Sequence, residues 1–121
     1  MVLRVLIVDD SPIFRDVAAE LLEQRGYIVA GEAGTAAEAL DAVDRLRPDA
    51  ILLDTMLPDG DGADVARSLS ISHPEVAVLL VSAMAEADVK SPLSAGCIRG
   101  FVTKSELARV ELGRYWPAAG D

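Results

Sequence analysis

The chain has 121 residues, 51% of them hydrophobic, which suits one domain with a buried core. Its 20 acidic and 11 basic residues give a net charge of −9, which argues against direct nucleic-acid binding because phosphate backbones are repelled. The single cysteine excludes an intrachain disulfide and a thiolate metal site, and no apolar stretch is long enough to cross a bilayer, so the sequence predicts a cytoplasmic protein without membrane contact.

Five short apolar segments alternate with segments of helical pattern. Each is nearly continuous in Leu, Val, Ile and Ala, as is typical of strands covered on both faces: residues 3–8, 28–33, 50–53, 76–81 and 98–102. The alternation predicts an α/β fold, a doubly wound five-stranded parallel sheet with helices on both faces. In such sheets ligands bind at the carboxyl ends of the strands, so functional residues are expected there.

The first predicted helix begins at Pro12, after Ser11 as its N-cap, and stops near Gly26. Three residues at helical spacing form its predicted apolar face: Ile13, Val17 and Leu21. The second helix begins after Thr35, where Glu38 three residues later completes a capping box. These signals place one helix after each of the first two strands.

A turn after the third strand precedes the third helix. The fourth helix is expected within residues 85–96, shortened or broken by Pro92, which lacks a backbone donor. A fifth helix is predicted over residues 105–116. Residues 1–116 are therefore expected to form the domain, and residues 117–121 a tail or the start of a linker.

Acidic residues follow two of the predicted strands directly. Asp9 and Asp10 come after the first strand and Asp54 after the third, so a parallel sheet brings three carboxylates to one edge. Their repulsion, on the order of several kcal/mol, favours a bound cation, and Mg²⁺ prefers such hard oxygen ligands. Each acid taken singly is explained as a helix cap, but three acids at one edge are not.

A hydroxyl and a cation end the next two strands. Ser82 can donate to a phosphoryl oxygen, and Lys104 can neutralise a carboxylate or a transferring phosphoryl group. A carboxylate beside a metal and a lysine can attack phosphorus and form an aspartyl phosphate. Asp54 is the predicted nucleophile. It is followed by residues 55–58, a stretch whose backbone N–H groups, absent only at Pro58, can face the transferred group.

This ordered set of motifs resembles the receiver domains of two-component response regulators, from Val2 to about Trp116. The matching segments are Val8-Asp9-Asp10-Ser11, LDTMLPDGDG at residues 53–62, Val81-Ser82-Ala83 and Gly100-Phe101-Val102-Thr103-Lys104. The resemblance implies a flavodoxin-like sheet of strand order 2-1-3-4-5. It also implies that a histidine kinase or phosphotransfer protein supplies the phosphoryl group.

The resemblance further implies a role for each matching residue. Asp54 is the phosphoacceptor, Lys104 pairs with the phosphoryl group, Ser82 swings to hydrogen-bond it, and Phe101 turns inward as the aromatic switch. The implied Mg²⁺ ligands are Asp9, Asp10, Asp54 and the backbone carbonyl of Met56. Helix four, strand five and helix five then form the surface that controls an output domain or partner protein, and a homodimer formed on phosphorylation is a further partner.

Two other functions stay open at this point. An aspartyl-phosphate phosphatase would use similar residues, but it needs a second acid two positions after the nucleophile, where Met56 stands. A pseudo-receiver, acting as a phosphorylation-independent binding module, is expected to have lost a key residue, and none is missing. If the chain is such a switch, it is expected to catalyse only its own phosphorylation and dephosphorylation and not to be an enzyme.

Two residues outside the motifs receive structural interpretations. His73 lies in a loop that contains a proline and has no acid partner near it in sequence, so we expect a solvated loop residue. Cys97 is expected to pack as a small hydrophobic side chain. Neither residue is predicted to carry chemistry.

Overall fold

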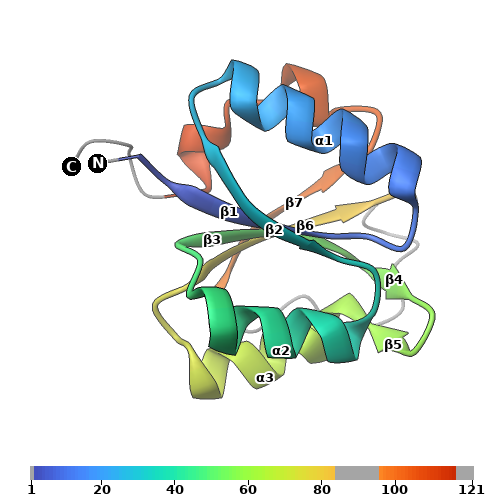
Figure 1. Cartoon of the computed structure of the whole chain (residues 1–121), viewed down its shortest axis with the longest axis vertical. Helices are drawn as coiled ribbons and strands as arrows, with labels where there is room; N and C mark the ends of the chain where they lie inside the picture. Colours follow the sequence, from blue (N-terminus) through green and yellow to red (C-terminus); the bar gives the residue numbers. More distant parts are fainter. Residues whose placement is uncertain (1, 84–95, 117–121) are drawn as a thin grey trace.

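The computed structural model describes residues 2–83 and 96–116, with a five-stranded parallel sheet at its centre (Figure 1). The strands of this sheet are β1 (Arg4–Val8), β2 (Ile28–Ala33), β3 (Ala50–Asp54), β6 (Ala77–Ser82) and β7 (Ile98–Thr103). Their spatial order is β2-β1-β3-β6-β7, with parallel pairing throughout. The predicted doubly wound fold and strand order are confirmed, and β1 and β3 are neighbours at the centre.

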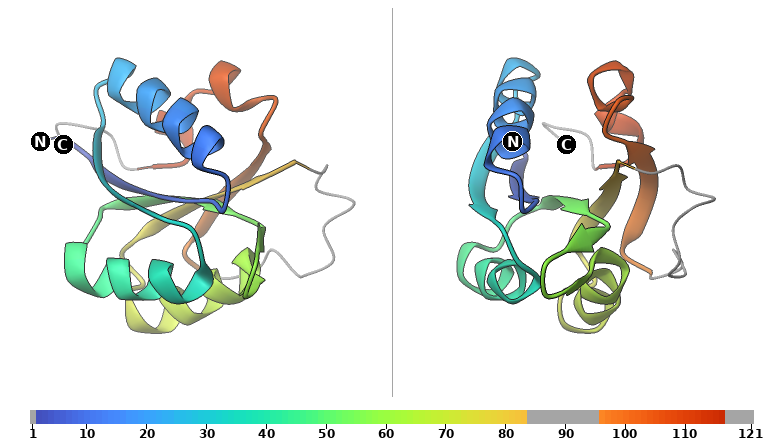
Figure 2. Two further views of the ribbon diagram at one scale, coloured as in Figure 1. Left: turned by 45° about the vertical axis from the view of Figure 1, so that its right-hand side comes forward. Right: turned by 90° about the vertical axis from the view of Figure 1, so that its right-hand side faces the viewer.

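Helices cover both faces of the sheet, as Figure 2 shows from the side. Helix α1 (Pro12–Gln24) lies on one face, and α2 (Ala36–Leu46) and α3 (Gly62–Ser72) lie on the other. Along each central strand the side chains alternate between two buried clusters: in β1, Val5 and Ile7 face α1, whereas Leu6 and Val8 face α2 and α3. This double burial explains why the central strands are apolar at consecutive positions between their ends.

The ends of the first two helices are set by the predicted caps. Ser11 Oγ accepts a hydrogen bond from the Phe14 N–H at 3.2 Å, and Thr35 Oγ1 accepts one from the Glu38 N–H at 3.1 Å. The Glu38 side chain completes the capping pattern one residue earlier than expected, on the N–H of Gly34. After α1 the backbone reverses at Gly26, whose φ of +88° favours glycine.

The predicted apolar face of α1 is wrong for Ile13 and Val17 and is confirmed for Leu21. Ile13 is 78% exposed and Val17 58% exposed, whereas Ala18 and Leu22 are completely buried. The face that packs on the sheet contains Phe14, Ala18, Leu21 and Leu22, at i, i+4, i+7 and i+8. Because Ala18 is small, the helix can approach the sheet closely. The face of the helix that contacts the sheet is therefore rotated by about one residue from the face that carries Ile13 and Val17.

The predicted fifth helix does not form. Two 3-10 helices, η2 (Leu107–Arg109) and η3 (Leu112–Arg114), replace it, with extended backbone at Val110 between them. The guanidinium of Arg25 donates to the carbonyl oxygens of Ala108 and Val110, which helical N–H groups would otherwise take. The segment still packs on the sheet, since Leu107, Leu112 and Trp116 are buried beside α1. The predicted fourth helix falls almost wholly on residues 84–95, outside the described residues.

His73 is not a solvated loop residue as expected. It is only 5% exposed at the C-terminus of α3, and its Nε2 lies 2.7 Å from Asp44 Oδ1 of α2. Asp44 is distant in sequence, so the sequence pattern could not reveal it. A second acid, Glu75, is only two residues away, and its Oε1 lies 3.7 Å from His73 Nδ1, so the expectation of no acid partner near in sequence is also wrong. The expectation for Cys97 is confirmed, because this residue is 1% exposed within the core. Among the described residues, no helix has the length and apolar character needed to span a membrane.

Candidate functional site

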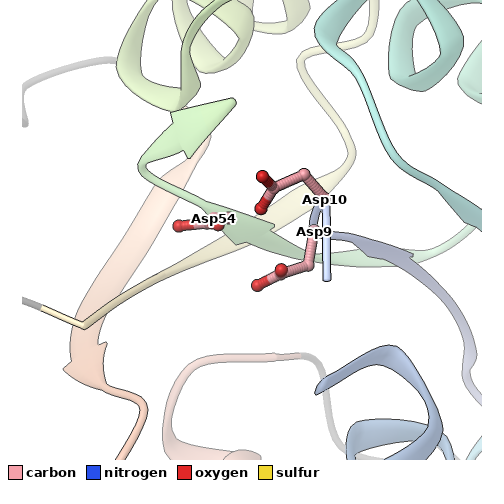
Figure 3. A group of neighbouring side chains, drawn as sticks. All are labelled: Asp9, Asp10 and Asp54. Atoms are coloured by element: carbon pink, nitrogen blue, oxygen red, sulfur yellow. The ribbon is translucent and has the colours of Figure 1, made fainter. Parts of the chain in front are cut away.

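Three carboxylates meet at the carboxyl ends of β1 and β3 (Figure 3). Asp9 and Asp10 follow β1, and Asp54 is the last residue of β3. Asp9 is fully buried and Asp54 is 6% exposed, while Asp10 is exposed to solvent. One oxygen from each lies within 4.8 Å of the others, so the predicted convergence of the three acids is confirmed.

Short backbone contacts orient the two buried carboxylates. Asp9 Oδ1 accepts a hydrogen bond from the Ser11 N–H at 2.8 Å, and Asp54 Oδ1 accepts one from the Met56 N–H at 3.2 Å. In each case the donor lies two residues ahead, the geometry of an Asx turn. One oxygen of each acid is thereby fixed by the backbone, and the second oxygen, Oδ2, is left for other partners.

Lys104 joins the acids from the end of β7. Its Nζ lies 2.7 Å from Asp9 Oδ2 and 3.7 Å from Asp54 Oδ2. The Lys104 N–H donates to the carbonyl of Ser82 at 2.8 Å, which continues the pairing of β6 and β7 and fixes where the side chain starts. Ser82, which is 1% exposed, ends β6 beside β3. The hydroxyl and the lysine therefore lie at the same sheet edge as the acids.

Burial raises the pKa of Asp54 from its ordinary value of 3.8 to about 6. The hydrogen bond from Met56 and the ammonium of Lys104 lower the pKa, and the neighbouring carboxylate of Asp9 raises it again. The site therefore holds more negative charge than Lys104 alone offsets. A divalent cation at the three converging oxygens would relieve this repulsion, and an all-oxygen donor set suits a hard ion such as Mg²⁺. The residues present fit such an ion.

The hairpin β4 (Met56–Leu57) and β5 (Gly60–Asp61) holds the chain that leaves Asp54. A Cβ on Gly62 would lie 2.1 Å from the Asp54 carbonyl oxygen, so only glycine fits there. The carboxylate of Asp59, in the turn of the hairpin, accepts the N–H groups of Ala36 at 2.7 Å and Ala37 at 3.1 Å. These bonds lower the pKa of Asp59 and attach the hairpin to the first turn of α2.

Sequence reasoning missed several supporting residues. Arg15 of α1 donates to the Asp9 carbonyl at 2.6 Å and to Glu32 of β2 at 3.0 Å, so it ties the acidic loop to the sheet. Asp59 and Gly62 were placed only within the segment 53–62 that resembles the receiver domains, without a role of their own. No pattern identifies Arg15, whereas a glycine at the first position of a helix could have indicated close backbone packing at Gly62.

The remaining predicted residues have clear positions. Phe101 lies in β7 and packs, partly buried, against the hydrophobic cluster on the α2 and α3 face. The Met56 side chain is 63% exposed, and its N–H, as described, contacts Asp54. Met56 therefore borders the site, whereas Phe101 lies three residues before Lys104 on the edge strand β7.

Comparison with known proteins identifies the family. The family model for the response regulator receiver domain matches residues 5–112. Chemotaxis protein CheY from Thermotoga maritima is 33% identical over 102 residues, which cover 84% of each chain. A protein-glutamate methylesterase/protein-glutamine glutaminase from Halobacterium salinarum is 38% identical over 91% of this chain, which spans about a third (32%) of that protein's length.

Solved structures give the same result. The signal receiver domain of the response regulator NarL from Mycobacterium tuberculosis superimposes with a TM-score of 0.77 and 34% identity, over 85% of this chain and 84% of that one. The response regulator domain of CheB from Thermotoga maritima gives a TM-score of 0.77 at 27% identity, over 94% and 86%. Family model, relatives and fold agree with the acidic edge of the sheet: the chain belongs to the response regulator receiver domains of two-component signalling.

Proposed function

We propose that this receiver domain is a switch in which Asp54 accepts a phosphoryl group from a histidine kinase or a phosphotransfer protein. The observation that carries the proposal is the position of Asp54: a buried carboxylate with one oxygen fixed by the backbone and the other 3.7 Å from Lys104 Nζ. A nucleophile needs such a fixed orientation and a nearby cation to accept the charge of the arriving group.

In the proposed transfer, a carboxylate oxygen of Asp54 attacks phosphorus, and the bond from phosphorus to the donor's leaving group breaks. Lys104 pairs with an oxygen of the transferred group, and Ser82 donates to another. A bound Mg²⁺ would be held by Asp9, Asp10, Asp54 and the Met56 carbonyl, and would supply charge stabilisation for the phosphoryl oxygens. The raised pKa of Asp54, about 6, still leaves most of the carboxylate ionised at neutral pH.

The proposed output is a change at β7 and the segment after it. Phe101 lies three residues before Lys104 on this edge strand, so movement of Ser82 toward a phosphoryl group would change the space beside the aromatic ring. The output surface differs from the one predicted, because η2 and η3 lie where a fifth helix was expected. An output domain or partner protein would therefore contact short turns beside β7.

The test is the intact mass of the protein after incubation with Mg²⁺ and a small-molecule phosphodonor. We expect the wild type to gain one phosphoryl group only when Mg²⁺ is present, and Asp54→Asn to gain none. Asp64→Asn is the matched control, because Asp64 is an exposed acid in the first turn of α3 and should leave the gain unchanged. A folded wild type without any gain would favour the pseudo-receiver, and steady release of inorganic phosphate from external phosphoesters would favour the phosphatase.

A further inference from the structure

Lys104 has a third neighbour besides the two acids. Its Nζ lies 4.4 Å from the centroid of the Phe14 ring, a cation–π contact. Phe14 is half-buried in the first turn of α1, on the face that packs on the sheet. An aromatic ring thus faces the ammonium group from the helix that begins directly after the acidic pair.

A continuous ring of contacts connects Phe14 with the acidic site. Asp9 Oδ1 accepts the Ser11 N–H, Ser11 Oγ accepts the Phe14 N–H, and the Phe14 ring faces Lys104. Lys104 Nζ then returns to Asp9 Oδ2 at 2.7 Å. Because each link fixes the next, the N-cap of α1 sets the place of the ring, and the ring in turn limits where the ammonium can lie.

This contact differs from the two ion pairs in one respect. A cation or phosphoryl group at the site competes for the carboxylate oxygens of Asp9 and Asp54, and so weakens their hold on Lys104. The Phe14 ring has no oxygen, so neither the metal ion nor the phosphoryl group binds to it, and its contact with Lys104 can persist. The Lys104 side chain is 25% exposed and has a flexible four-carbon stem, so without the ring it has an open route into solvent.

We propose that Phe14 is a positioning residue for phosphoryl transfer: its ring holds the Lys104 ammonium at the acidic edge while Asp9 and Asp54 engage the metal and the incoming group. This inference rests on the proposed function. Loss of one partly shielded cation–π contact is expected to slow phosphorylation by about threefold to tenfold. The effect belongs to the transfer step, because Phe14 is not a ligand of the metal.

The experiment compares phosphorylation rates at saturating Mg²⁺ for the wild type, Phe14→Leu, Phe14→Trp and Ile13→Ala. Leucine fills space without a π face, and tryptophan restores the face. Ile13 is the matched control because it precedes Phe14 in the same turn and is 78% exposed. We expect Phe14→Leu to be slower by the stated factor, Phe14→Trp to recover most of the rate, and Ile13→Ala to match the wild type. Mg²⁺ affinity should change by less than about twofold in all four proteins.

A spectroscopic readout does not depend on transfer or on any variant folding. In the wild type, the ε-methylene protons of Lys104 lie near the ring face, so their NMR signal should be shifted upfield by the ring current. Absence of that shift would overturn the inference. An unchanged transfer rate in a folded Phe14→Leu, with a wild type that is phosphorylated, would overturn this inference alone, whereas a wild type that takes no phosphoryl group would overturn the proposed function and the inference with it.

Discussion

Replacing Asp54 by asparagine is expected to stabilise the protein at neutral pH when divalent cations are absent. Asparagine keeps an oxygen that accepts the Met56 N–H but carries no charge beside Asp9. A carboxyl whose pKa is about 6 in the folded protein and 3.8 in the unfolded chain costs the fold roughly 3 kcal/mol once it is ionised. The buried amide of asparagine has a desolvation cost of its own, so a net gain of about 1–3 kcal/mol is expected.

The sign of the pH dependence follows from the raised pKa. Below about pH 3 the Asp54 carboxyl is protonated in both states, so Asp54→Asn should show no gain in stability there. The gain should grow as the pH rises from about 3 through the folded pKa of about 6 and then stay constant. Urea unfolding of the wild type and the variant, in the presence of a chelator and at several pH values, measures this difference in the free energy of unfolding. The single tryptophan, Trp116, is 3% exposed and stacks edge-on against Tyr27, so its fluorescence reports unfolding.

Magnesium supplies the control for this prediction. At a concentration about a hundred times its Kd, Mg²⁺ should stabilise the wild type by about 2.7 kcal/mol at pH above 6, and Asp54→Asn should gain much less because it lacks one carboxylate ligand. The reasoning would be refuted by a variant that is less stable than the wild type in chelator at about pH 8, or by a gain as large at pH 4 as at pH 8.

Two further predictions test the packing around the site. On α1, Leu22→Ala should lower the free energy of unfolding by about 2–5 kcal/mol, because this side chain is buried. Val17→Ala should lower it by less than about 0.5 kcal/mol, because Val17 is 58% exposed. Equal losses in urea unfolding would contradict the observed helix face. Gly62→Ala should lower the free energy of unfolding by at least about 1–3 kcal/mol and weaken Mg²⁺ binding in a calorimetric titration, because its Cβ would meet the Asp54 carbonyl oxygen at 2.1 Å. Gly113→Ala is the control: its Cβ would have no atom within 4 Å, so neither stability nor Mg²⁺ binding should change.

The sheet could be predicted from the sequence because its strands are buried on both faces. Continuous apolar runs placed β2 at residues 28–33, as observed, and the other four strands to within a residue at each end. Convergence of the acids followed from topology alone, since parallel strands end at one edge. The short hairpin β4–β5 was missed because two-residue strands show no periodicity.

Contacts between segments distant in sequence explain the other errors. The segment after β7 has a helical pattern, but Arg25, more than eighty residues away, takes its carbonyl groups. The face of α1 was misassigned because Ile13 and Val17 are more apolar than Ala18, whose small size decides the packing. That error also hid the contact between Phe14 and Lys104, which depends on how α1 is rotated about its axis.

The attachment of Asp59 to α2 makes two segments open together. Its carboxylate holds the N–H groups of Ala36 and Ala37, so the hairpin after Asp54 cannot leave the domain without exposing the first turn of α2. In hydrogen exchange, these two amides should behave as members of one cooperative unit with the hairpin, although they lie about twenty residues from it in sequence. Exchange at the start of α2 thus becomes a local reporter on the loop that carries the acceptor aspartate.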